Sequence, residues 1–132
     1  VTLVVSVLKT CGFTPEPDDQ DNIVVKFHVR KDKRPVPVRL RLKSGPSMSR
    51  RHSVQIYVPW ANGEAKLAKK ADRIKVLAIA ARWEVSTSIG SIGGELVLSR
   101  YQLLDTMDKD ELSYHVELVA EAYRELAIEF GA

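Results

Sequence analysis

The sequence predicts an α+β domain of two layers, in which helices cover one face of an antiparallel sheet. Three segments alternate apolar and polar residues, as strands with one buried and one exposed face do. Two other segments repeat apolar residues every three or four positions, which indicates amphipathic helices. Short connections between the alternating segments favour antiparallel pairing. The expected order is helix, three strands, helix, two strands, helix, in a single domain over residues 1–132.

The chain begins with an apolar segment that we expect to be a short helix. Its apolar residues have the spacing of one helix face: Leu3, Val4, Val7 and Leu8. Gly12 follows where a left-handed C-terminal cap is expected. Because no positively charged stretch precedes this segment, we interpret it as a helix of the fold rather than a signal peptide. Residues 14–21 (TPEPDDQD) are polar and contain two prolines, so they predict a connector.

Three strands are expected next, each with an apolar side. These sides consist of Ile23, Val25, Phe27 and Val29, then Val36, Val38, Leu40 and Leu42, and then Val54, Ile56, Val58 and Trp60. Residues 31–34 are short enough for a hairpin turn between the first two. Pro35 and Pro37 cannot donate ladder hydrogen bonds, so we expect that end of the second strand at an edge or a bulge.

The second half of the chain predicts a helix, a hairpin and a long final helix. Residues 63–83 form the first of these, with Asn62 as N-cap and a core-facing stripe of Leu67, Ile74, Leu77, Ala78 and Ala81. Gly93-Gly94 supplies the turn between strands at 85–89 and 96–100. Asp108 caps the last helix, which presents to the core Leu112, Val116, Val119, Tyr123, Leu126 and Phe130.

Two stretches of the sequence carry a resemblance to a known family. They are the hairpin STSIGSIGGELVLSRY and the helix DKDELSYHVELVAEAYREL. With the order and lengths of the other elements, they resemble the YbjN-like family, which has the fold of type III secretion chaperones. The resemblance covers nearly the whole chain and lies in pattern and hydrophobic spacing. It implies a small, often dimeric, non-enzymatic protein that binds peptide segments of clients or acts in regulation.

The charge of the chain is divided by position. Residues 22–82 hold sixteen Lys and Arg against three acids, a net charge of +13. Residues 83–132 hold three bases against ten acids, a net charge of −7, and residues 1–21 add −3. Such a division indicates an anionic partner or two parts that neutralise each other, with the acidic last helix screening the basic middle.

Composition also limits the class of protein. The single cysteine, Cys11, excludes an internal disulfide and a multi-cysteine zinc site, which fits a cytoplasmic protein. Charged residues interrupt every apolar stretch, so we expect no membrane-spanning segment.

The polar face of the three-stranded sheet is the main candidate binding surface. We expect it to carry Tyr57, with Gln55 beside it, and the cations Lys26, His28, Arg30, Arg39, Arg41 and Lys43. Like charges opposite one another on paired strands repel, so this face would gain from an anion, an acidic peptide or the acidic last helix. The alternative, which we favour, is a solvated face whose long side chains extend into water.

Two loops of the sequence have some features of phosphate-binding loops. Arg50 and Arg51 in the loop 44–52 could contact a phosphate, but P-loop spacing is missing and a basic hairpin loop is the favoured interpretation. Residues 90–94 (GSIGG) precede a strand rather than a helix, so we interpret them as a hairpin turn rather than a cofactor loop.

No catalytic set is recognisable. His28, His52 and His115 are spread over a strand, a loop and a helix, without metal-ligand spacing, and His115 is expected at the boundary of the last helix's apolar stripe. Cys11 has no local base, and the acids at 108–111 are explained by a helix N-terminus. We therefore expect no enzyme, no cofactor and no metal.

The leading hypothesis is a non-enzymatic protein- or peptide-binding module, chaperone- or adaptor-like or regulatory. Binding would combine sheet-edge pairing, an apolar groove and basic contacts. The alternative is a nucleic-acid-binding domain that uses the basic sheet face, although only Tyr57 is expected there as a stacking aromatic. A homodimer is a further expectation, formed through strand edges or the end at Tyr57–Trp60. We favour the other interpretation of Trp60, a core residue that staples the start of the middle helix.

Overall fold

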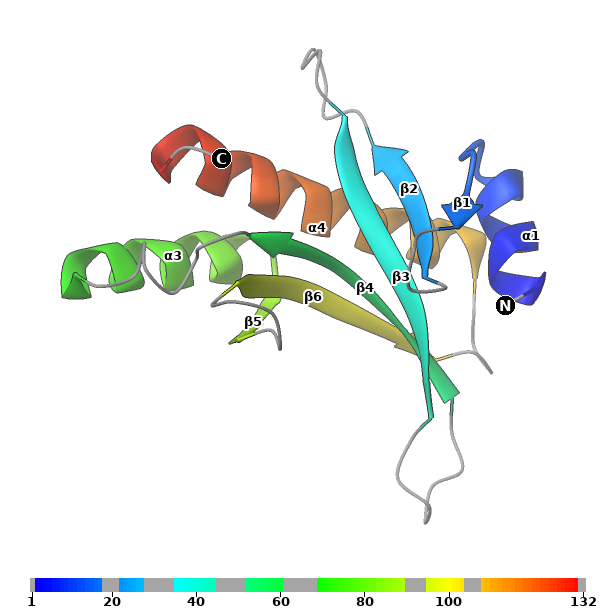
Figure 1. The fold of residues 1–132 in the computed structure, drawn as a ribbon, viewed down its shortest axis with the longest axis horizontal. Helices are drawn as coiled ribbons and strands as arrows, with labels where there is room; N and C mark the ends of the chain where they lie inside the picture. The colour runs from blue at the N-terminus through cyan, green and yellow to red at the C-terminus, as the bar shows by residue number, and fades with distance from the viewer. Residues whose placement is uncertain are drawn as a thin grey trace.

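The structure, a computed structural model, describes residues 2–17, 22–27, 35–44, 52–60, 69–89, 95–103 and 108–130. Its elements are α1 (Thr2–Thr10), β1 (Glu16–Pro17), β2 (Ile23–Phe27), β3 (Val36–Ser44), β4 (His52–Trp60), α3 (Lys70–Arg82), β5 (Ser86–Ile89), β6 (Leu96–Leu103) and α4 (Lys109–Phe130). Figure 1 shows their arrangement. The predicted order is confirmed, with one addition: a two-residue strand, β1, in the segment expected to be a connector.

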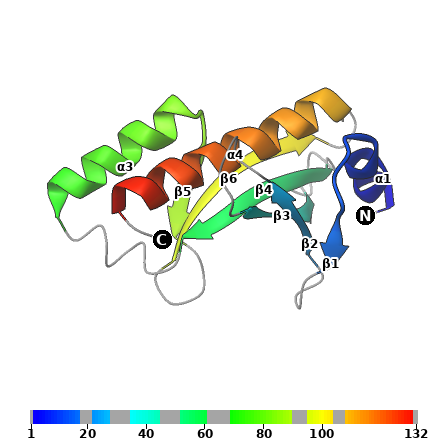
Figure 2. The same ribbon diagram turned by 90° about the horizontal axis from the view of Figure 1, so that it is seen from above.

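The strands form one antiparallel sheet of six in the order β1-β2-β3-β4-β6-β5. The long helix α4 lies along one face of this sheet, with α1 beside its N-terminal end and α3 beside its C-terminal end (Figure 2). The other face carries no helix in the part of the chain that the structure describes, and we call it the open face. The predicted α+β fold with two layers is therefore confirmed.

The core lies between α4 and the helix-covered face of the sheet. Alternate strand residues, including Val38, Ile56 and Leu98, are fully buried there. The stripe predicted for α4 is buried against them, with Leu112, Val116, Val119 and Leu126 inaccessible to solvent and Tyr123 and Phe130 partly buried. The apolar face of the strands, with its period of two, and the apolar stripe of α4, with its period of 3.6, thus pack together in one layer.

Trp60 is a core residue. Its ring lies 5.6 Å from that of Phe130, at the end of α4. Tyr57 is only 6% exposed and Trp60 only 1%, so the expectation that the Tyr57–Trp60 end is a surface for self-association is wrong. The staple that we expected at the start of the middle helix falls on residues that the structure does not describe.

The prediction of which side of α3 packs on the core is wrong. Ile74 and Leu77 are 58% and 59% exposed, and the buried residues of the helix are Val76, Ile79 and Ala80. This helix carries apolar residues on two opposite sides. Contact with α4 and β5 selects the side that continues into the half-buried Trp83 and the buried Val85.

The predicted helix caps at Gly12 and Asp108 are confirmed. Gly12 has a φ of +87°, and the amides of Gly12 and Phe13 donate to the carbonyls of Lys9 and Leu8, which is the Schellman arrangement. An Asp108 carboxylate oxygen accepts hydrogen bonds from the Asp110 and Glu111 amides, at 2.7 and 3.4 Å.

Several other predicted features lie outside the described residues. These are the turn at 31–34, the strand end at Val29, the N-cap Asn62, Leu67 of the stripe, and the loops at 45–51 and 90–94.

The end of α3 repeats the Schellman arrangement with a residue other than glycine. The amides of Glu84 and Val85 donate to the carbonyls of Ala81 and Ala80, and Glu84 has a φ of +55°. An L-residue in this left-handed conformation costs about 1 kcal/mol relative to glycine.

We therefore predict that Glu84→Gly raises the free energy of unfolding by about 0.5–1 kcal/mol, measured by urea denaturation. The Glu84 carboxylate, which is exposed, lies 3.7 Å from Arg100 and contributes little. Glu84→Gln is the matched control, because it removes the charge and keeps the strained backbone. Equal stability of the two variants would contradict the prediction.

Candidate functional site

The predicted cations that the structure describes stand on the open face. Arg39 is paired in register with Val24 on one side and Tyr57 on the other, and Arg41 with Gln55. Lys26 shares this face, since it pairs with Pro37, two residues before Arg39. No described cation lies directly opposite another, so the repulsion expected between facing charges is reduced by the register.

Of the other predicted site residues, the structure describes the backbone of one and nothing of the remaining four. Lys43 pairs in register with Ser53, which places its backbone position on the open face, but its side chain is not described. The remaining four lie outside the described residues: His28, Arg30, Arg50 and Arg51.

Tyr57 lies on the predicted face but is buried rather than available for stacking. Its hydroxyl accepts a hydrogen bond from the side-chain Nδ2 of Asn22 at 3.0 Å. The Arg41 guanidinium lies 4.9 Å from the centre of its ring, and Arg41 Nε donates to Gln55 Oε1 at 2.7 Å. Tyr57 therefore fixes the orientation of Arg41. The expectation that it offers a stacking surface is wrong, because neighbouring side chains cover the ring.

An exposed aromatic does lie nearby, on the neighbouring strand. Tyr101 of β6 pairs in register with Gln55 and is 50% exposed on the open face. We did not predict it as a site residue, because the alternation in the sequence indicated a strand ending at Arg100, whereas β6 continues to Leu103.

β3 is longer than the strand beside it. Pairing with β2 begins at Leu40, opposite Ile23, and β3 continues through Arg41–Ser44 in register with β4. Among the described residues no strand pairs with Arg41–Ser44 on the β2 side. A strand edge of this kind presents alternate N–H and C=O groups that another chain can bind.

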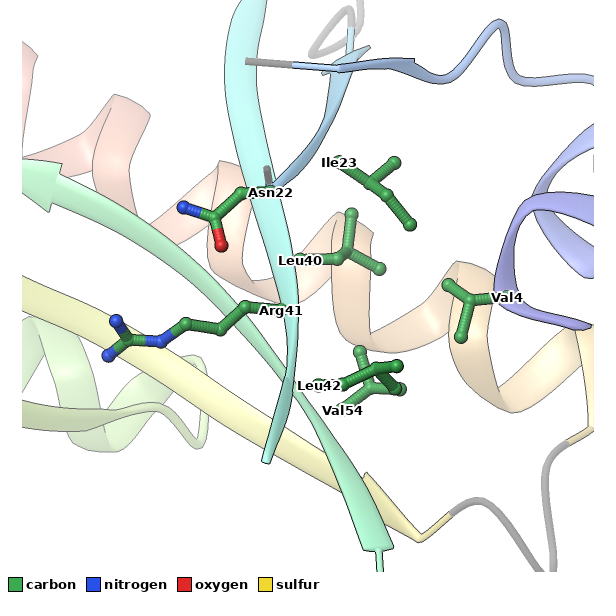
Figure 3. Close-up of a pocket in the computed structure, with 7 residues that line it drawn as sticks. All are labelled: Val4, Asn22, Ile23, Leu40, Arg41, Leu42 and Val54. Atoms are coloured by element: carbon green, nitrogen blue, oxygen red, sulfur yellow. The ribbon is translucent and has the colours of Figure 1, made fainter. Parts of the chain in front are cut away.

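An apolar pocket of about 230 Å³ opens beside this edge. It is lined by Val4 of α1, Asn22 and Ile23 at the start of β2, Leu40, Arg41 and Leu42 of β3, and Val54 of β4. Figure 3 shows the five apolar side chains gathered on one side of β3, while Arg41 and Asn22 point to the other. The volume is below the roughly 300–1,000 Å³ of typical small-molecule sites. It suits one or two apolar side chains.

Leu42 departs from its predicted role. It has the helix-facing register of the core residues, yet its side chain is 41% exposed and forms a wall of the pocket. The reason is that β2 begins opposite Leu40, so no β2 residue flanks Leu42. Nothing in the alternation of the sequence shows where the neighbouring strand begins.

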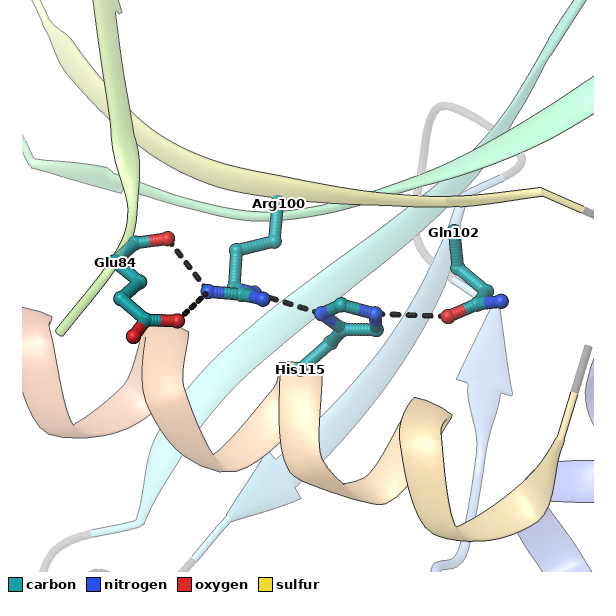
Figure 4. A network of polar contacts seen from close by, with 4 residues as sticks. All are labelled: Glu84, Arg100, Gln102 and His115. Atoms are coloured by element: carbon teal, nitrogen blue, oxygen red, sulfur yellow. Dashed lines mark hydrogen bonds and ion pairs between the residues drawn. The ribbon is translucent and has the colours of Figure 1, made fainter.

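His115 is held between two residues of β6 (Figure 4). Arg100 Nε donates to its Nδ1 at 2.7 Å, and its Nε2 lies 2.8 Å from Gln102 Oε1. These partners require the neutral ring with its proton on Nε2, which donates to Gln102. Arg100 also donates to the Glu84 carbonyl at 2.6 Å. Both ring nitrogens have partners, as expected for a boundary residue that joins α4 to the sheet.

Cys11 links the first and last helices. Its thiol donates to the Lys109 carbonyl at 3.2 Å, and burial, with Asp110 nearby, raises the pKa of the thiol. In the part of the chain that the structure describes, no group of His, Cys, Asp or Glu side chains is arranged to hold a metal ion.

The acidic last helix pairs with α3. Lys75 Nζ lies 3.3 Å from Glu129 Oε1, and Arg82 forms an ion pair with Glu125. Because α4 lies on the helix-covered face, these carboxylates are separated by the sheet from Lys26, Arg39 and Arg41. The acidic last helix therefore pairs with cations of the basic middle at α3, as the predicted screening requires. It does not pair with the described cations of the open face.

Comparison with known proteins supports the fold. No family model matches the chain, and no curated protein matches it. A crystal structure of an uncharacterized protein from Methanothermobacter thermautotrophicus is similar, with 14% identity and a TM-score of 0.59 over 98% of this chain and 94% of that one. Identity this low shows a shared fold alone, so the resemblance to the YbjN-like family stays a prediction. None of the described helices combines the length and the apolar character needed to span a membrane.

Stability should decrease in mild acid because of His115. Burial and the neighbouring Arg100 lower its pKa in the folded protein below the ordinary value of 6.5. As the pH falls through that value, the unfolded chain therefore takes up the proton before the folded one. The stabilisation that His115 contributes to the folded state is complete above about pH 6.5 and is lost as the pH falls below that value.

The measurement is the free energy of unfolding in urea from about pH 8 to about pH 5 for the wild type and His115→Gln. We expect the wild type to lose more stability than the variant between about pH 7 and pH 5, since glutamine does not titrate. Parallel curves for the two proteins would contradict the role given to His115.

Proposed function

We propose that this domain is a non-enzymatic module that binds an extended peptide segment of another protein at the β3 edge, Arg41–Ser44. One observation carries the proposal: the strand edge and the apolar pocket lie side by side. The first offers main-chain hydrogen bonds and the second accepts a side chain, the two elements that recognition by strand addition needs.

The pleat of β3 predicts an alternating peptide. Successive side chains of an added strand point to opposite faces of the sheet. Those on the helix-covered side meet the pocket between Leu40, Leu42 and Val4, which favours aliphatic residues. Those on the other side meet the open face.

Charge on the open face favours acidic residues in the alternate positions. Arg41 is nearest to the edge and is already oriented by Gln55 and Tyr57, so little side-chain entropy is lost when it binds a carboxylate. Arg39 lies on the same face two residues away, and Lys26 on β2 is exposed. The preferred segment therefore alternates aliphatic and acidic residues.

This mode of binding suits a chaperone, adaptor or regulatory role. Main-chain hydrogen bonds are common to all sequences, and a pocket for one or two side chains selects only loosely. Such a site can hold unfolded segments of one or several partners. Nucleic acid is the competing ligand for the cations. Because Tyr57 is covered, Tyr101 is the exposed aromatic that the structure describes on the open face, whereas readers of single strands stack successive bases on several aromatics.

The test uses a fluorescent ten-residue peptide of alternating valine and glutamate and the full chain, with binding followed by anisotropy. We expect saturable binding that is lost when a central valine is replaced by proline, since proline removes a backbone donor. Replacing the glutamates by lysine should weaken it, because Arg41 would then face a like charge.

Leu42→Asp places a charge in the pocket wall and should weaken peptide binding at least about tenfold, or roughly 1.4 kcal/mol. Ile128→Asp on α4 is the matched control, because Ile128 is also an exposed aliphatic residue and lies outside the pocket. Circular dichroism checks that both variants fold. Equal affinities for wild type and Leu42→Asp would refute the site. Salt-sensitive binding of oligonucleotides without binding of the peptide would favour the nucleic-acid alternative.

A further inference from the structure

α3 presents an apolar stripe to solvent. Its residues are spaced by three and four positions and all are exposed: Ala71, Ile74, Leu77, Ala78 and Ala81. At 100° per residue the stripe lies opposite the buried side of the helix, which carries Val76, Ile79 and Ala80. The helix is therefore apolar on two sides, and only one of them packs on the rest of the chain.

The stripe belongs to neither the core nor the β3 edge. In Figure 1, α3 lies at the opposite end of the molecule from α1, which contributes Val4 to the pocket. Single exposed aliphatic residues are ordinary, but an ordered helical stripe is typical of a surface that binds a second helix.

Cations border the stripe on both sides. Arg73 lies on one side, and Lys75 and Arg82 on the other, while Lys70 lies in line with the stripe at the N-terminal end of the helix. The acid of this helix, Asp72, is half-buried on the inner side. Lys75 and Arg82 are already paired with glutamates of α4. The chain itself thus shows that cations of α3 pair with glutamates on an adjoining helix.

We infer that this stripe docks an acidic amphipathic helix of another protein. Ile74 and Leu77 pack into the apolar side of the incoming helix, and the three small alanines let its backbone approach closely. Glutamates or aspartates flanking that apolar side meet Lys70 and Arg73.

The helices that the structure describes do not supply such a helix from a second copy of this chain, and α1 has no acidic residue. Pairing α3 with α3 would set Lys70 and Arg73 against like charges. The acidic α4 has Tyr114 and Ile128 as its exposed large hydrophobic residues, about four turns apart, which does not match the adjacent pair Ile74 and Leu77. The partner is therefore a different protein, whose helix has apolar residues within two adjacent turns.

The experiment uses a labelled 18-residue helical peptide with leucines at helical spacing of three and four and flanking glutamates. Its binding to the full chain is measured by anisotropy. A peptide with lysine in place of every glutamate, and one with the same composition in scrambled order, are the ligand controls. We expect saturable binding of the acidic helix at least about tenfold tighter than of either control.

Ile74→Gln with Leu77→Gln should weaken that binding at least about tenfold, because glutamine keeps helix propensity and removes apolar surface. Both residues are exposed, so the fold is retained. Lys70→Glu with Arg73→Glu should reverse the preference toward the lysine peptide. Ile128→Gln is the matched control and should bind like the wild type, as should Leu42→Asp, which separates this site from the β3 edge.

Three results would overturn the inference. The first is the absence of saturable binding, or equal affinity for the acidic and the lysine peptides. The second is a dimer in sedimentation that Ile74→Gln with Leu77→Gln dissociates, because a second copy would then cover the stripe. The third is binding to anionic phosphatidylserine vesicles in place of the peptide, abolished by the same substitutions.

Discussion

The packing of α4 across the sheet is the constraint on which the rest of the structure depends. One apolar stripe, from Leu112 to Leu126, covers the alternate residues of the central strands. A shift of one residue in any strand would move its apolar residues to the opposite face, so this packing fixes the register. It also fixes the location of the cations. Residues next to a buried Val38 or Leu40 must point to the side that α4 does not cover.

The same packing decides which surfaces stay open to partners. α4 runs across the sheet, with α1 and α3 at its two ends, and neither end is fully closed. At the α1 end, β3 continues past the start of β2 and leaves a strand edge next to an apolar pocket. At the α3 end, the helix uses one of its two apolar sides for α4 and β5. Both candidate surfaces therefore arise where an element has no described neighbour, β3 beyond the start of β2 and α3 on its outer side.

Periodicity predicted the features that depend on neighbours along the chain. The strand faces, the α4 stripe and the caps at Gly12 and Asp108 follow from local spacing, and the structure confirms them. The features that depend on neighbours in space were missed. Leu42 is exposed because of where β2 begins, and Tyr57 is covered because Arg41 and Asn22 close over it. In α3 the sequence contained two apolar sides, and the larger stripe in the sequence was not the buried one.

The two proposals share one account of how a chain with so basic a middle would bind selectively. Positive charge alone attracts any polyanion, and salt weakens that attraction. On the open face, Arg41 is held by Gln55 and the ring of Tyr57, so its guanidinium has one orientation beside one strand edge. On α3, Lys75 and Arg82 are occupied by Glu129 and Glu125. The charges at each surface thus lie next to an apolar element, and each proposed ligand has to match both. In both proposals, shape and hydrophobic contact select among acidic ligands, and charge sets the rate and orientation of encounter.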